Sequence, residues 1–180
     1  MGTEEIVEAT KEWLEKVVIG LNLCPFAKPV QNRIRYAFSG AETPEALQRD
    51  LAEELRILAA ADPDEIETTL LIHPRVLTDF LDYNDFLDVA DDTLADLELV
   101  GEIQIASFHP EYQFTGTGPD DVENYTNRSP YPMLHLLREA SVDRAVAAFP
   151  DASRIYERNI ETLRALGHEG WRRLGILKDR

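Results

Sequence analysis

Residues 102–139 read EIQIASFHPEYQFTGTGPDDVENYTNRSPYPMLHLLRE, and the rest of the chain is organised around this stretch. Its first residues have the apolar pattern of a buried strand, which ends where a proline follows His109. A polar loop rich in Asp, Asn, Tyr and Arg comes next. Ser129 and Pro130 then match a helix cap with proline in the first turn, so we expect a helix to begin there. So many hydrogen-bonding groups in one loop beside a core strand suggest a functional site.

The segments outside this stretch alternate between helix and strand. Apolar residues at helical spacing predict helices over 6–21, after Thr43-Pro44 and over 76–97, the last of which Tyr83-Asn84 would divide. Residues 33–39 alternate as a strand does, and the apolar run 67–73 predicts a second strand buried on both faces. After the loop, the spacing predicts one helix that ends near Pro150 and another that stops at Gly167.

This order predicts a single globular α/β (or α+β) domain over residues 1–180. The sheet would be small, mixed or parallel, with about three to four strands packed by about five helices. A ferredoxin-like α+β sandwich is the alternative, and the sequence leaves both open.

Charge and cysteine content limit the partners and the compartment. The chain has 34 acidic against 18 basic residues, a net charge of −16, which repels nucleic-acid phosphates and anionic lipids. We therefore expect no nucleic-acid partner, and no apolar run reaches the roughly 20 residues that span a membrane. A single cysteine, Cys24, forms no internal disulfide, and the acidic start lacks an apolar signal core, so we expect a cytoplasmic protein.

Four residues are candidates for catalysis. Cys24 offers the strongest nucleophile available to the chain if a nearby cation stabilises its thiolate. His109 titrates near neutrality and would act as the general base, with Asp120 or Asp121 orienting its ring. The alternative for Cys24 is a small buried side chain with a packing role.

A second set of residues is expected to hold the ligand. Arg128, just before the expected helix start, would clamp an anion together with the free backbone N–H groups there. Residues 115–119 would form a mobile cover. The alternative is that the polar side chains only tie the loop to itself. The predicted substrate-binding residues are Tyr112, Asn124, Asn127, Arg128, His135 and Arg138.

The sequence is compatible with three functions. The first is an enzyme that acts on a small anionic or acyl substrate at a Cys/His/Arg site, and the second is a noncatalytic ligand-binding or interaction module. The third is a metal-binding protein, for which Cys24, His73, His109 and His135 would supply a tetrahedral set, although their spacing matches no local zinc signature. The sequence determines neither a cofactor nor the oligomeric state.

Three segments resemble a known family. They are LNLCPFA at 21–27, ASFHPEYQF at 106–114 and TNRSPYPMLHLLREAS at 126–141. Together they resemble the bacterial family catalogued as domain of unknown function 1415. The resemblance implies a stand-alone bacterial protein of similar length, and it assigns no catalytic residue. It places Cys24, His109 and Arg128 inside the segments that are typical of the family.

Overall fold

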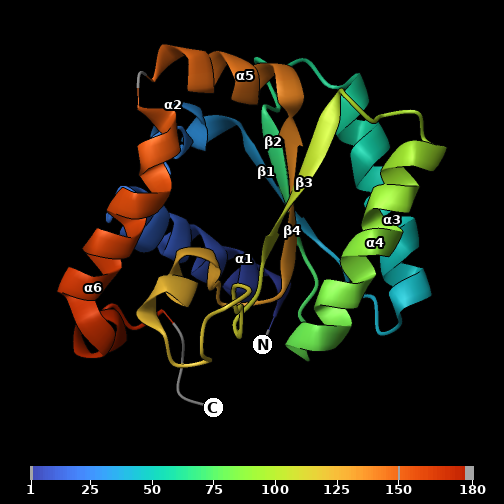
Figure 1. Cartoon of the computed structure of the whole chain (residues 1–180). Helices are drawn as coiled ribbons and strands as arrows, with labels where there is room; N and C mark the ends of the chain where they lie inside the picture. The colour runs from blue at the N-terminus through green and yellow to red at the C-terminus, as the bar shows by residue number, and fades with distance from the viewer. Residues whose placement is uncertain (1, 150, 177–180) are drawn as a thin grey trace.

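The computed structural model describes residues 2–149 and 151–176, which form one four-stranded sheet with helices on both faces (Figure 1). The strands are β1 (Ile34–Phe38), β2 (Thr68–Ile72), β3 (Ile103–Phe108) and β4 (Met133–Arg138). The α-helices are α1 (Thr3–Trp13), α2 (Ala27–Val30), α3 (Pro44–Ala60), α4 (Phe80–Asp96), α5 (Glu139–Ala148) and α6 (Ile155–Arg173). Shorter helical segments are the π-helix η1 (Leu14–Ile19) and the 3-10 turns η2 (Gln31–Arg33), η3 (Val122–Asn127) and η4 (Ala152–Arg154).

The sheet is mixed, with the strand order β1-β2-β4-β3. β1 pairs with β2 in parallel, whereas β4 is antiparallel to both β2 and β3. The three strands that precede the polar loop therefore run in the same direction, and β4 lies between two of them. This arrangement brings Leu70 of β2 and Ala106 of β3 to either side of His135 in β4.

Two apolar cores lie on opposite faces of the sheet. α3 and α4 cover one face, where the leucines of α3 pack against Leu71, Leu134 and Leu136. α1, η1 and α6 pack on the other face, against Leu70, Ile72 and Met133 (Figure 1). The α/β prediction is thus confirmed. The ferredoxin-like alternative does not fit, because its helices would lie together on one face of an antiparallel sheet.

Local signals placed most of these elements correctly. The Thr43 hydroxyl accepts a hydrogen bond from the Ala46 N–H at 3.2 Å, which caps α3 as expected. β2 is buried along its whole length, as predicted for a strand covered on both faces. α4 continues past Tyr83 without a break, because Tyr83 itself is buried with Phe86 and Ala90 in the core, and the partly buried Phe80 packs against the same core.

The helix predicted to begin at Ser129 and Pro130 was wrong. Residues 133–138 form β4, and a helix, α5, begins only at Glu139. The Ser129 hydroxyl donates to the Tyr131 carbonyl at 2.7 Å and caps no helix. A short apolar run fits either state by its spacing, and here two neighbouring strands supply the backbone partners that make it a strand.

The burial of β3 differs from the prediction of a buried strand. β3 is an edge strand, and only its first residue, Ile103, is buried. α6 is interrupted at Gly167, whose φ of 65° and ψ of 176° are not helical, so the helix stops there as predicted, and a second helical segment continues from the kink to Arg173. Trp171 is therefore part of α6 and packs in the core, while Leu177 lies outside the described residues. Within the described ranges, no helix combines the length and apolar character needed to cross a membrane.

Candidate functional site

The polar loop is held together by its own side chains. Asn124 is fully buried, and its Oδ1 accepts from the Phe114 N–H at 2.9 Å and the Thr117 hydroxyl at 2.8 Å. Its Nδ2 donates to the Gly118 carbonyl at 2.7 Å. Asn127 Nδ2 donates to the Ser107 carbonyl at 2.9 Å and so fastens the loop to β3. These bonds tie residues 114, 117 and 118 to Asn124, and two of these residues belong to segment 115–119, for which we predicted a mobile cover.

Arg128 also forms hydrogen bonds within the polar loop. Its Nε donates to the Tyr112 carbonyl at 3.2 Å and its Nη2 to the Pro119 carbonyl at 2.6 Å. The guanidinium lies 4.8 Å from the centre of the Tyr125 ring. No helix starts beside Arg128, because residues 133–138 form a strand. The predicted anion site therefore lacks the free backbone N–H groups that a helix start would supply.

Of the other loop residues, Asp120 and Asp121 are exposed. Asp121 Oδ2 accepts from the Gly118 N–H at 2.8 Å. Tyr112 packs against Phe80 with ring centroids 5.1 Å apart, and its hydroxyl lies 3.1 Å from the Ser107 hydroxyl. The predicted roles of these side chains toward a substrate stay predictions.

His73 and His109 follow the carboxyl ends of β2 and β3, as expected for strands that run in the same direction. Both rings are fully buried and pack against Tyr83 of α4, with centroids 5.8 and 5.0 Å away. His109 Nε2 lies 3.1 Å from the Leu77 carbonyl, and its Nδ1 accepts from the Glu111 N–H at 3.0 Å. Burial lowers the pKa of His73 to about 4. This pair therefore fastens α4 to the end of the sheet.

Cys24 lies on the other side of the molecule from this pair. It packs with the core formed by α1, η1 and α6, whereas His109 packs against Tyr83 and Phe80 of α4. Burial raises the pKa of the Cys24 thiol, and this effect outweighs the hydrogen bonds from the backbone of Phe26 and Ala27 that lower it. The thiol is therefore protonated at neutral pH, which weakens it as a nucleophile.

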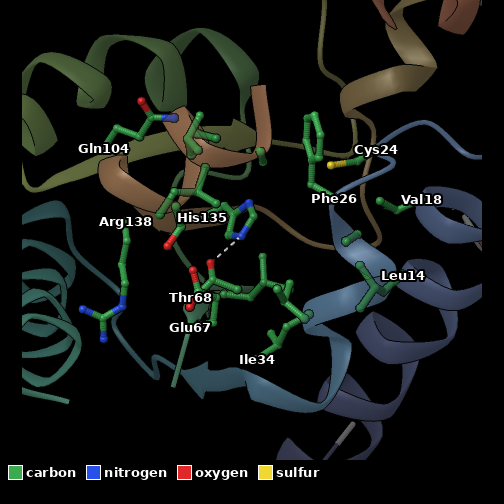
Figure 2. Close-up of a pocket in the computed structure, with 18 of the residues that line it drawn as sticks. Leu14, Val18, Cys24, Phe26, Ile34, Glu67, Thr68, Gln104, His135 and Arg138 are labelled. Carbon is green, nitrogen blue, oxygen red and sulfur yellow. Dashed lines mark hydrogen bonds between the residues drawn. The ribbon is translucent and has the colours of Figure 1, made fainter. Parts of the chain in front are cut away.

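Cys24 and His135 border a cavity between the sheet and the helices α1, α2 and α5 (Figure 2). Its volume is about 330 Å³. Nearly all of its surface is apolar, with Trp13, Phe26 and Phe108 as its largest side chains. Side chains of all four strands line its floor, and Val142 and Ala145 of α5 close one side. A concave, mostly apolar space with few polar groups is typical of small-molecule sites.

His135 is the central polar group of this cavity. Its Nε2 lies 2.7 Å from the Thr68 hydroxyl, and that hydroxyl lies 2.6 Å from the Leu136 carbonyl (Figure 2). The ring lies deep in the protein, yet part of its surface is accessible because it borders the cavity. Burial lowers the pKa of His135 to about 4, so the ring is uncharged at neutral pH.

Arg138 borders the cavity only through its stem, because its guanidinium points away toward α3 (Figure 2). Its Nη2 lies 2.9 Å from each of the carbonyl oxygens of Leu58, Ala61 and Ile66. The helix expected after Ser129 would have placed Arg138 and His135, three residues apart, on one face, but both belong to a strand and point to opposite faces of the sheet.

The cavity contains residues that the sequence did not single out. Thr68 and Glu67 come from β2 and the turn before it, and Gln104 comes from β3. Glu67 is buried, and its carboxylate lies 3.6 Å from Arg33 Nη1. A polar threonine at the start of an otherwise apolar buried strand was the available signal for Thr68.

The metal-binding alternative finds no support in the described part of the chain. No group of three or more His, Cys, Asp or Glu side chains is placed there to hold an ion. The predicted ligands separate into two places: His73 and His109 surround Tyr83, whereas Cys24 and His135 border the cavity.

Comparison with known proteins gives a family and no function. No curated protein matches the chain, and no solved structure does. A family model with the description "Protein of unknown function (DUF1415)" matches residues 5–173, a range that holds all four strands and the cavity between them and the helices. The chain therefore belongs to the family described as Protein of unknown function (DUF1415).

Proposed function

We propose that this protein binds a small, uncharged, largely apolar molecule in the cavity between the sheet and the helices α1, α2 and α5. The observation that carries the proposal is the cavity itself, about 330 Å³ with an almost entirely apolar lining. An apolar cavity of roughly 150 Å³ takes up benzene, so this one has room for a molecule of about two fused rings.

The ionisation of the bordering groups supports an uncharged ligand. Both Cys24 and His135 are uncharged at neutral pH, for the reason that burial disfavours their charged forms. Arg138 directs its charge to the end of α3, and Glu67 lies beside Arg33. Both charged side chains of the described lining thus have partners outside the cavity, which makes them poor counter-charges for a buried ion.

Binding without catalysis is the simplest function of this geometry. The enzyme hypothesis, with Cys24 as nucleophile and His109 as base, stays a prediction, and so does its anionic substrate. We also retain the proposal of a reducing, cytoplasmic compartment, which is consistent with a single free cysteine.

The test is a titration of benzofuran, a neutral bicyclic molecule, followed by ligand-observed NMR. Ala106→Leu and Ala145→Leu each add a larger side chain to the cavity lining and are expected to abolish binding. Ala148→Leu is the matched control, because Ala148 is on the same helix as Ala145 but is exposed and outside the lining. Absence of benzofuran and indole binding to the wild type, or equal binding to the filled variants, would refute the proposal.

A further inference from the structure

The hydrogen bonds of Thr68 determine where the proton of the His135 ring lies. The Leu136 carbonyl can only accept, so the single hydroxyl proton of Thr68 is donated to it over 2.6 Å. The Thr68 oxygen is then left as an acceptor for His135 Nε2 at 2.7 Å. Nε2 must therefore carry the ring proton.

The other ring nitrogen is consequently a bare acceptor. A neutral imidazole has one proton, and with that proton on Nε2 the Nδ1 atom has only its lone pair. The low pKa of His135 is consistent with a neutral ring. Nδ1 lies on the side of the ring away from Thr68, and none of the residues in the described ranges forms a hydrogen bond with it (Figure 2).

The Nδ1 acceptor of His135 in an apolar cavity favours a ligand that carries an N–H or O–H group. An acceptor without a partner in an apolar space costs free energy, and a ligand N–H or O–H at that point removes the cost. Among the other polar residues of the lining, the Glu67 carboxylate is also an acceptor, whereas Gln104 and Ser141 can both donate and accept. Trp13, Phe108 and Phe26 add flat apolar surfaces, and Trp13 and Phe108 meet edge to face at 5.2 Å.

We infer that the ligand is a neutral aromatic molecule that donates one hydrogen bond to His135 Nδ1, and that Thr68 sets this preference by fixing the ring proton on Nε2. Indoles and phenols are the chemical class. The inference rests on the proposed function of the cavity, and it adds that donors are selected over ligands of the same shape that lack a donor.

The decisive comparison is between indole and benzofuran on the wild-type protein at pH 7.5. The two molecules have the same bicyclic shape, but indole has an N–H where benzofuran has a ring oxygen. Benzofuran is the more apolar, so a cavity that selected by hydrophobicity alone would prefer it. We expect indole to bind at least about fivefold more tightly, the factor given by one ordinary net hydrogen bond.

The outcomes separate the two proposals. Binding of both probes with equal affinity, or tighter binding of benzofuran, would overturn the donor preference and leave the binding function standing. Binding of neither would overturn the binding function itself. A clear preference for indole would support both.

Variants test whether Thr68 and His135 cause the preference. His135→Phe removes the acceptor and should bring the two affinities to within about twofold while benzofuran still binds. Thr68→Val removes the partner of Nε2–H, so the ring proton is no longer fixed and the preference should fall. Thr69→Val is the matched control, because Thr69 is the next residue of β2 and its side chain lies on the opposite face of the sheet.

Equal effects of Thr68→Val and Thr69→Val would overturn the role of Thr68. Circular dichroism would establish that each variant is folded. If His135→Phe does not fold, the two threonine variants still test the inference. Thr68→Val is expected to lose the preference for indole over benzofuran, and Thr69→Val is expected to keep it.

Discussion

Replacement of Arg138 by methionine is expected to destabilise the protein strongly, although the side chain belongs to no predicted catalytic step. Its Nη2 lies 2.9 Å from the carbonyl oxygens of Leu58, Ala61 and Ile66, at and just beyond the end of α3. The Nη2 group has two protons, so it makes two full hydrogen bonds, each worth about 1.5–3 kcal/mol because the donor is charged. A positive charge at a helix C-terminus is itself favourable.

The buried Nε of Arg138 offsets part of the stabilisation that these hydrogen bonds provide. Arg138 Nε is buried without a partner among the described residues, at a cost of about 1–3 kcal/mol that methionine would remove. The net loss on Arg138→Met is therefore about 2–4 kcal/mol in the free energy of unfolding. Methionine keeps much of the stem that borders the cavity, so binding of benzofuran by the folded variant should change little.

Urea unfolding followed by circular dichroism measures this loss directly. Arg56→Met is the control, because Arg56 lies on α3, the helix whose end Arg138 contacts, but is exposed and has a carboxylate only at 4.0 Å. Its effect should stay within about 0.5 kcal/mol. Equal stability of Arg138→Met and Arg56→Met would refute the reasoning that Arg138 holds the end of α3.

Acid should destabilise the protein, because His73 and His135 have a pKa of about 4 when folded, whereas the unfolded chain protonates them near 6.5. The free energy of unfolding should be constant above pH 6.5 and fall by up to about 3 kcal/mol per histidine toward pH 4, and equal urea midpoints at pH 7 and pH 5 would contradict this. Thr69→Val should stabilise by about 1 kcal/mol, because the Thr69 hydroxyl is buried without a hydrogen bond to the described residues, and a lower thermal midpoint would count against it. Asn124→Ala should speed hydrogen exchange of the Phe114 amide while exchange in α3 is unchanged, and uniform exchange would show that Asn124 does not hold the loop. Cys24 should react with a neutral maleimide more slowly than free cysteine at pH 7, and indole should slow it further, whereas faster reaction would revive the nucleophile hypothesis.

Most strands and helices before residue 109 followed from local signals, although the short helix α2 was not predicted. The cap and proline at Thr43-Pro44 started α3, and the alternation over 33–39 predicted β1. These signals act between residues that are close in sequence, so they can be interpreted without the rest of the chain. The histidines at the ends of β2 and β3 were predicted in the same way.

The candidate site could not be predicted in this way. Cys24 and His135 were both singled out, but the sequence grouped Cys24 with His109 and His135 with the polar loop, or both with His73 and His109 as metal ligands, and it did not place them together at an apolar cavity. The cavity that they border is formed by segments from residue 13 to residue 145, and its shape exists only once those segments pack. Thr68 becomes important only because β4 brings His135 and Leu136 beside it.

The sequence by itself indicated a mixed helix-and-strand fold, contained the family segments and predicted a polar loop, for which bonding within the loop was one of two interpretations. Tertiary structure decided that residues 133–138 form a strand, because the backbone partners that make β4 a central strand lie 61–69 residues upstream in β2 and 25–35 residues upstream in β3. Tertiary structure also decided the direction of the Arg138 side chain. In a strand, His135 and Arg138 point to opposite faces of the sheet, whereas in a helix they would lie on the same face. Non-local hydrogen bonds and packing outweigh a local apolar pattern that is compatible with either state.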